Sequence, residues 1–171
     1  ASITDLSAIA SQSFDAVFSS HNIEHLFPHE APLAFREFSR VLNDQGFLVL
    51  TCPDITSIAN FIAANGLDAT AYISARGPIT PLDMLFGHSD SIRKGNHFMA
   101  HKTGFTPKSL RDTLSQSGFA AILSVEKSAK FELWALASKS SLSRDEITDL
   151  AVKHIPGTAS LRKKLPAEGE P

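Results

Sequence analysis

A single cysteine, Cys52, is present among the 171 residues, so no disulfide can form within the chain. This composition is compatible with a reducing compartment, and we expect Cys52 to be a small buried apolar residue. No apolar stretch approaches the roughly 20 residues of a membrane-spanning helix, and no basic segment followed by an apolar one begins the chain at Ala1. We therefore expect a cytoplasmic protein without membrane insertion, unless a leader segment precedes Ala1.

An excess of positive charge is also lacking. The chain has 16 lysines and arginines against 18 aspartates and glutamates, which gives a net charge of −2. Its one cationic cluster is Arg162-Lys163-Lys164, near the carboxyl end. Proteins that bind a nucleic-acid backbone usually carry a basic stripe, so we expect no nucleic-acid partner. With 43% hydrophobic and 20% charged residues, the composition is that of one globular domain.

Glycine-rich turns and metal motifs are absent as well. No G-x-G occurs, so the turn that lets backbone amides approach a nucleotide is missing. Three histidine pairs have the four-residue spacing that would place two imidazoles on one face of a helix. They are His21 and His25, His25 and His29, and His97 and His101. Because Pro28 interrupts a helix through His29, and neither a cysteine cluster nor H-E-x-x-H is present, we predict no metal site.

Residues 13–53 alternate between strand-like and helix-like patterns. A short apolar run over 14–19 ends in polar residues, as a buried strand ends at the edge of a sheet. Apolar residues then recur at helical spacing over 32–42, with Pro32 in the first turn. The uninterrupted apolar run over 47–51 is typical of a strand that is covered on both faces. The pattern predicts two adjacent parallel strands joined through a helix.

Capping residues, helical spacing and apolar runs predict further elements in the rest of the chain. They are a helix over 54–65, a helix from Thr106 to Gly118, strands over 119–125 and 131–137, and a helix from Ser143 to His154. Residues 67–104 are broken by glycines and prolines, and we predict a helical turn at 81–86 but no strand there. Beyond Thr158 we expect fraying or disorder through Pro171.

Several motifs in this order resemble the class I S-adenosylmethionine-dependent methyltransferases, particularly the small-molecule group called type 11. They are FDAVF at 14–18, EHL at 24–26, and E-x-x-R-V-L-x-x-x-G at 37–46, which continues into an apolar strand ending at Pro53. The resemblance implies an α/β fold, namely part of a doubly wound, Rossmann-like sheet. This sheet would be mostly parallel and would end in a carboxyl-terminal antiparallel hairpin. The resemblance also implies S-adenosylmethionine as the cofactor.

The resemblance extends to about Lys139 and suggests how the chain is divided. Residues 1–139 would form the carboxyl-terminal portion of a methyltransferase domain, in which 68–103 would be a substrate lid. Residues 140–171 would be an appended helix and a flexible tail. The family's glycine-rich turn and ribose-binding carboxylate are missing, so we expect a fragment, a processed product or part of a longer protein. The missing strands would leave an exposed sheet edge through which the chain could self-associate.

The resemblance also implies cofactor-binding residues, because ligands of such sheets bind at the carboxyl ends of the strands. Asp5 and Leu6 would contact the adenine. Ser20, His21 and Asn22 would lie beneath the methionine part of the cofactor. For Asp5, the alternative is an acidic turn residue without a ligand.

Glu24 and His25 are the candidate catalytic residues. Methyl transfer is an in-line displacement, and a hydroxyl or ammonium acceptor must also lose a proton, for which histidine is suited near neutral pH. A histidine that is bonded to a backbone carbonyl beneath the next helix is the alternative for His25. In the lid, His97, His101 and Lys102 are candidate substrate-binding residues, and a polar surface loop is the alternative.

The sequence therefore predicts S-adenosylmethionine-dependent methyl transfer to a small-molecule or lipid- or sugar-linked acceptor. The alternative is a cofactor-free half-domain that acts as an inactive scaffold or interaction fragment. Because half of the cofactor site is missing, we expect residues 1–171 alone not to bind S-adenosylmethionine usefully. The fold does not specify whether oxygen, nitrogen or carbon accepts the methyl group.

Overall fold

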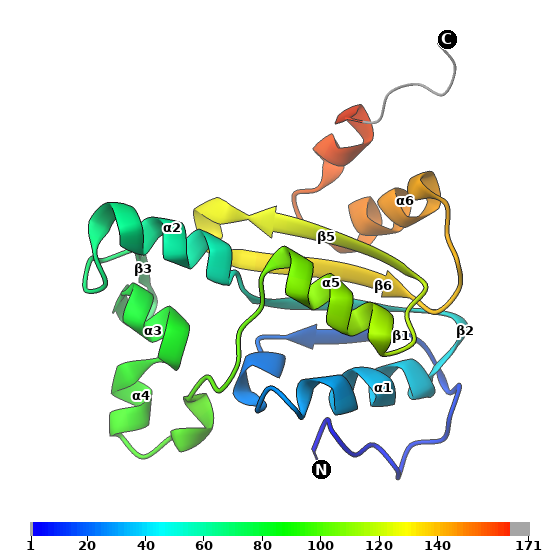
Figure 1. Ribbon diagram of the computed structural model, residues 1–171, viewed down its shortest axis with the longest axis horizontal. Coiled ribbons are helices and arrows are strands. Elements are labelled where there is room, and N and C mark those ends of the chain that lie inside the picture. Colours follow the sequence, from blue (N-terminus) through cyan, green and yellow to red (C-terminus); the bar gives the residue numbers. More distant parts are fainter. Residues whose placement is uncertain (1, 165–171) are drawn as a thin grey trace.

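A computed structural model describes residues 2–164, which form an α/β fold around a four-stranded sheet in the order β1-β2-β6-β5 (Figure 1). The strands are β1 (Phe14–Ser20), β2 (Leu42–Pro53), β5 (Ala121–Lys127) and β6 (Glu132–Ser138). β1 and β2 pair in parallel, whereas β6 is antiparallel to both β2 and β5. β5 therefore points the same way as β1 and β2, and the sheet is mixed: it starts with the parallel pair β1 and β2 and ends in the predicted antiparallel hairpin.

The predicted strand-helix-strand unit is confirmed. α1 (Ala31–Val41) joins β1 to β2, with Pro32 in its first turn. Its inward face includes Phe35 and Phe38, both buried. Burial of one such side chain stabilises the fold by about 1.5–3 kcal/mol relative to leaving it in water. This helical face fixes how the carboxyl ends of β1 and β2 lie beside each other.

Helices cover both faces of the sheet (Figure 1). α1 and α5 (Pro107–Gln116) cover one face, over a core that includes Leu48, Leu110 and the buried Cys52. α6 (Arg144–His154) covers the other face, where Ile147 packs with Val49 in a second core. None of the helices in residues 2–164 is long and apolar enough to cross a membrane.

The segment between β2 and α5 lies beyond the carboxyl ends of β1 and β2 (Figure 1). Its elements are α2 (Ile55–Asn65), β3 (Tyr72–Ser74), β4 (Gly77–Ile79), α3 (Pro81–Phe86), α4 (Ser89–Arg93) and the 3-10 turn η2 (His97–Met99). Ile58, Ile79 and Met84 form a third core cluster that joins α2, β4 and α3. Residues 68–103 of this segment are called the lid below.

The prediction that the lid contains no strand was wrong. β3 and β4 pair as an antiparallel hairpin, from Tyr72 opposite Ile79 to Ser74 opposite Gly77. The Ser74 hydroxyl closes the turn by donating to the carbonyl of Gly77 at 3.0 Å and accepting from the backbone N–H of Arg76 at 3.0 Å. Strands of three residues are too short to produce a readable alternation of polar and apolar residues. The predicted helical turn at 81–86 is confirmed as α3.

Beyond Thr158, where the sequence predicted fraying, the described residues 159–164 form a short helix. Thr158 is buried, and its hydroxyl donates to the carbonyls of Ala151 and Ile155 at 3.0 and 2.6 Å. The 3-10 helix η4 (Ala159–Lys164) follows, and Leu161 packs against the core beneath α6. The hydroxyl thus ties the chain back to the helix it leaves. The rest of the predicted tail, 165–171, lies outside the described residues.

One edge of the sheet is formed by β1, which carries exposed aromatic residues. Phe18 is 66% exposed, and its ring stacks on that of Trp134 at a centroid distance of 6.4 Å. Phe14 on the same strand is also exposed. A strand edge with apolar side chains tends to pair with another chain. Self-association through this edge stays a prediction.

Candidate functional site

The candidate site begins where β1 ends. His21 follows the strand with φ of 46°, a left-handed conformation that is uncommon for a residue with a side chain. Its backbone N–H still donates to the carbonyl of Thr51 at 3.0 Å, so β1 and β2 remain joined at this point. The chain then turns through η1 (Ile23–His25), which presents Glu24 and His25 at the carboxyl ends of the two strands.

Glu24 connects this turn to the lid. Its side chain is only 1% exposed, and one carboxylate oxygen accepts a hydrogen bond from Nδ1 of His21 at 3.1 Å. Its backbone carbonyl accepts from the N–H groups of Lys102 and Thr103, at 2.8 and 3.2 Å. The end of the lid is therefore held by the backbone of the same residue whose carboxylate is buried.

Two histidines that are far apart in the sequence meet here. The rings of His25 and His101 are edge to face, with centroids 5.0 Å apart. Nδ1 of His25 lies 3.1 Å from the carbonyl of Ala100, and Nδ1 of His101 lies 2.8 Å from that of Met84. A carbonyl can only accept, so both Nδ1 atoms carry a proton and, in the neutral rings, both Nε2 atoms hold a free electron pair.

Three buried side-chain oxygens of the described residues have no hydrogen-bond partner: Ser19 Oγ, Glu24 Oε2 and Thr51 Oγ1. Ser19 lies near the end of β1 and Thr51 near the end of β2, where Ser20 pairs with Thr51. Buried polar atoms nearly always have a partner in proteins, so each of these oxygens is a candidate contact for a water, an ion or a ligand. All three lie at the carboxyl ends of these two strands.

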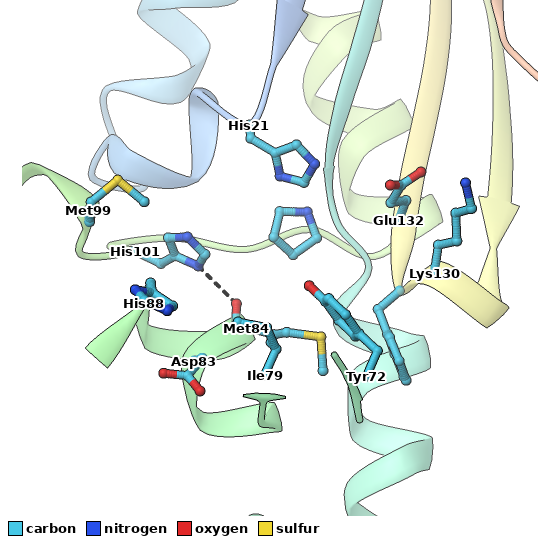
Figure 2. A pocket seen from close by; sticks show the side chains of 12 residues that line it. His21, Tyr72, Ile79, Asp83, Met84, His88, Met99, His101, Lys130 and Glu132 are labelled. Carbon is cyan, nitrogen blue, oxygen red and sulfur yellow. Dashed lines mark hydrogen bonds between the residues drawn. The ribbon is translucent and has the colours of Figure 1, made fainter. Parts of the chain in front are cut away.

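A pocket of about 180 Å³ opens beside this cluster (Figure 2). His21 reaches it from the end of β1, and His101 reaches it from the lid. The rest of its wall comes mainly from the lid and from the start of β6. These residues are Pro53, Tyr72, Ile79, Asp83, Met84, His88, Met99, Lys130, Phe131 and Glu132. The pocket thus combines apolar surface with groups of both charges.

Two histidines of the pocket wall have pKa values shifted in opposite directions. The hydrogen bond to Glu24 raises the pKa of His21, against the opposing effect of burial. Burial lowers the pKa of His101, which favours its neutral form. Burial also raises the pKa of Tyr72, so this hydroxyl keeps its proton. The pocket therefore offers one histidine that favours the charged form and one that favours the neutral form.

The predicted adenine-binding residues have structural partners elsewhere. Asp5 accepts from the N–H of Ser7 at 3.0 Å, and hydrogen bonding by the side chain and then the backbone of Ser7 lowers the pKa of Asp5. The N–H of Leu6 donates to Glu37 at 2.7 Å, and the carbonyl of Leu6 accepts from Arg40 at 2.8 Å. None of the hydrogen bonds in residues 2–164 joins Asp5 or Leu6 to residues 20–22. Their role in binding adenine stays a prediction.

The predicted lid residues divide into two groups. His101 reaches the cluster with His25, whereas His97 is exposed and does not line the pocket. Lys102 is exposed and places its Nζ 4.6 Å from the centre of the Phe27 ring, a cation–π contact. Ser20 and Asn22 flank His21 and are exposed. Only His101 of the three lid residues therefore lies in the pocket wall.

Sequence reasoning missed several pocket residues, including Tyr72, Asp83 and Glu132. Tyr72 belongs to the hairpin that was not predicted, and Glu132 lies in a strand expected only to close the sheet. The capping-box spacing of Thr80 and Asp83 was a signal, and both of its hydrogen bonds are present. Hydrogen bonds from Ser89 and Thr80, opposed by burial, hold the pKa of Asp83 at about 2.

Comparison with known proteins supports the resemblance seen in the sequence. Residues 1–50 match the Methyltransf_11 family model, described as a methyltransferase domain. No curated protein matches the chain significantly. The motif pattern and this match agree, so the resemblance to class I S-adenosylmethionine-dependent methyltransferases is confirmed.

Solved structures show the same fold at low sequence identity. A SAM-dependent methyltransferase from Thermotoga maritima, described as a possible histamine N-methyltransferase, is 14% identical, with a TM-score of 0.50, over 82% of this chain and 62% of that one. A possible exported protein from Bordetella parapertussis is 14% identical, with a TM-score of 0.52, over 82% and 43%. An O-methyltransferase family protein from Burkholderia thailandensis is 10% identical, with a TM-score of 0.52, over 84% and 35%. The chain thus spans less than two thirds of the length of these proteins.

Proposed function

We propose that this chain supplies the acceptor side of a class I methyltransferase site, which transfers a methyl group from S-adenosylmethionine to a small-molecule or lipid- or sugar-linked acceptor as part of a longer protein. The observation that carries the proposal is the meeting of His25 and His101 at the carboxyl ends of β1 and β2. In open α/β sheets this is where ligands bind. The family match over residues 1–50 adds the expected chemistry.

The described residues fit part of a cofactor site. The unpartnered oxygens of Ser19 and Thr51 and the turn at His21 support a binding place for the methionine part of S-adenosylmethionine at the ends of β1 and β2. The pocket volume of about 180 Å³ is below the roughly 300–1,000 Å³ of complete ligand sites. The glycine-rich turn and the ribose-binding carboxylate have no counterpart in the sequence. In this proposal, Ser20, His21, Asn22, Asp5 and Leu6 bind one side of the cofactor.

In the proposed reaction, the cofactor supplies a methyl group on a positively charged sulfur. We assign His25 as the base: it does not line the pocket itself but contacts His101, which does, and the Ala100 carbonyl holds its Nδ1 and leaves its Nε2 for a proton. Glu24 holds His21 and the end of the lid in place. The pocket residues position the acceptor, with His101 opposite His21 (Figure 2). The nature of the acceptor atom is open, since a protein described as a possible histamine N-methyltransferase and an O-methyltransferase family protein share this fold.

The experiment is methyl transfer from labelled S-adenosylmethionine to pooled small metabolites, with the full-length protein. His25→Gln is compared with His29→Gln, because His29 is exposed and packs on Phe27 outside the pocket. Loss of a general base costs about 10²–10⁴-fold in rate, so His25→Gln should lose this much while cofactor affinity is kept. Equal rates for the two variants would refute the role of His25.

The alternative, an inactive scaffold, is decided by cofactor binding. Isothermal titration of residues 1–171 with S-adenosylmethionine should show no useful binding, because association costs an estimated 4–15 kcal/mol before any contact contributes. Micromolar binding by a monodisperse monomer would show that the cofactor site is misplaced. If the full-length protein also fails to bind the cofactor, the scaffold function replaces methyl transfer. A cytoplasmic location is part of the same proposal.

A further inference from the structure

A second kind of site is formed by Glu24, His25 and His101. One ligand atom of each, a carboxylate oxygen or an imidazole nitrogen, lies within 4.8 Å of the other two. Glu24 is fully buried, and its Oε2 has no hydrogen-bond partner among the described residues. An unpaired buried carboxylate is costly unless a cation or hydrogen-bond donor compensates it. The carboxylate of Glu24 is thus bonded through one oxygen to His21, and its other oxygen has no partner among the described residues.

We propose that Glu24, His25 and His101 bind a divalent transition-metal ion, zinc by preference, which fastens the lid to the end of β1. Two imidazoles and one carboxylate form the donor set of many catalytic zinc sites, with a fourth position open. Glu24 and His25 lie in η1, and His101 lies in the lid. A metal ion bound by all three would therefore connect the lid to the end of β1.

The hydrogen bonds around the two histidines prepare them as ligands. In metal sites, the ring nitrogen that does not bind the metal usually donates to a carbonyl or carboxylate, which fixes the ring. His25 and His101 both do this, through the carbonyls of Ala100 and Met84. Their Nε2 atoms are thus left for the metal. The carboxylate of Glu24 is also held: its Oε1 is hydrogen-bonded to Nδ1 of His21 at 3.1 Å.

The separations are compatible with such a site after a small contraction. Tetrahedral ligands about 2.0–2.1 Å from zinc lie about 3.4 Å from one another. One donor atom of each residue lies within 4.8 Å of the other two, so the longest of these separations exceeds the tetrahedral value by about 1.4 Å at most. His25 cannot be a metal ligand and a free base in the same molecule, so metal binding would assign proton removal to another group.

The metal site differs from the histidine pairs that the sequence suggests. His25 with His29, and His97 with His101, have the four-residue spacing, but His29 and His97 are exposed and away from the cluster. The two proposed histidine ligands are His25, in η1, and His101, in the lid. His29 and His97 are matched controls, because each lies four residues from a proposed ligand but outside the cluster.

The test is metal affinity of the full-length protein without a histidine tag, in the absence of cofactor and acceptor. The protein is stripped with a chelator, and zinc is titrated in competition with a chromophoric chelator. Cobalt(II) is added separately, because its visible spectrum reports a four- or five-coordinate site. His101→Gln and Glu24→Gln should each weaken zinc binding by more than the about 10–100-fold that loss of an outer partner costs. His29→Gln and His97→Gln should leave the affinity unchanged.

Circular dichroism and urea unfolding of each variant identify loss of folding. If Glu24→Gln is unfolded, His101→Gln carries the test, because His101 lies on a lid loop. The proposal is overturned if the stripped protein binds zinc no more tightly than His101→Gln does. It is also overturned if His29→Gln or His97→Gln removes the binding. Because neither methyl donor nor acceptor is present, failure of methyl transfer leaves this result unaffected, and failure of metal binding leaves His25 free to act as the base.

Discussion

Gly87 at the end of α3 controls how closely the lid packs on itself. Its φ is +94°, and a Cβ built at this position would lie 1.9 Å from the carbonyl oxygen of Met99. Met99 lines the pocket, and Ala100, directly after it, provides the carbonyl that holds His25. We predict that Gly87→Ala displaces this part of the lid and separates His101 from His25.

The magnitude follows from two separate effects. Gly87 has φ of +94° and ψ of 158°, a region that is essentially restricted to glycine and costs another residue of order 1–3 kcal/mol. Gly95 also has a positive φ, +93°, but a Cβ there would meet nothing within 4 Å. Gly95→Ala is therefore the matched control for strain alone. At Gly87 the Met99 carbonyl must also retreat by about 1.1 Å to reach 3.0 Å, and such overpacking adds about 1–3 kcal/mol.

Hydrogen exchange is the appropriate assay, because it detects local opening that does not require global unfolding. The N–H groups of Lys102 and Thr103 donate to Glu24, so their protection measures lid closure. Gly87→Ala should reduce their protection more than Gly95→Ala by roughly 5–150-fold, which corresponds to about 1–3 kcal/mol. A displacement of about 1 Å can also slow catalysis by about 100-fold. Equal protection in the two variants would refute the close packing at Gly87.

Three other changes have defined outcomes. Asp54→Ala removes a buried helix cap that accepts from the Ser57 hydroxyl, and should cost about 2–4 kcal/mol in urea unfolding, while Asp54→Asn, which can still cap, should cost less. The pKa of Asp83 is lowered to about 2, with Ser89 as a hydrogen-bond partner. The contribution of the ionised Asp83 to the free energy of unfolding is therefore present above about pH 4 and lost as the pH falls toward 2. Asp83→Asn should remove that dependence in acid unfolding curves, and an unchanged curve would contradict it. Asp5→Ala in the full-length protein should weaken S-adenosylmethionine binding by about 1–3 kcal/mol in calorimetry, and unchanged affinity would count against the adenine assignment.

The central fold could be predicted from the sequence because its patterns are long and regular. The apolar runs in β1 and β2 and the helical spacing of α1 each extend over several residues, and the family motifs agreed with them. The lid hairpin could not be predicted in this way. It depends on Ser74 closing a turn and on Ile79 packing against Ile58 and Met84, which are contacts between elements.

The site was predictable only where it follows the chain. Glu24 and His25 were identified because they belong to the EHL motif of the family resemblance, and His101 because it lies in a loop expected to cover the site. The spacing of the histidines suggested the wrong partners, since it compares residues four apart, whereas His25 meets a residue 76 positions later. Tertiary contacts decide such pairs, and they leave no periodic signal in the sequence.

Those same contacts make the site depend on the position of the lid. The carbonyl of Glu24 holds Lys102 and Thr103, and the carbonyl of Ala100 holds Nδ1 of His25. When the lid opens, His25 loses the hydrogen bond that fixes its proton on Nδ1, and His101 leaves in the same movement. Because both a free base and a metal ligand require Nε2 to be unprotonated and correctly aimed, either chemistry is assembled only with the lid closed. An acceptor that closes the lid would therefore complete the site that acts on it.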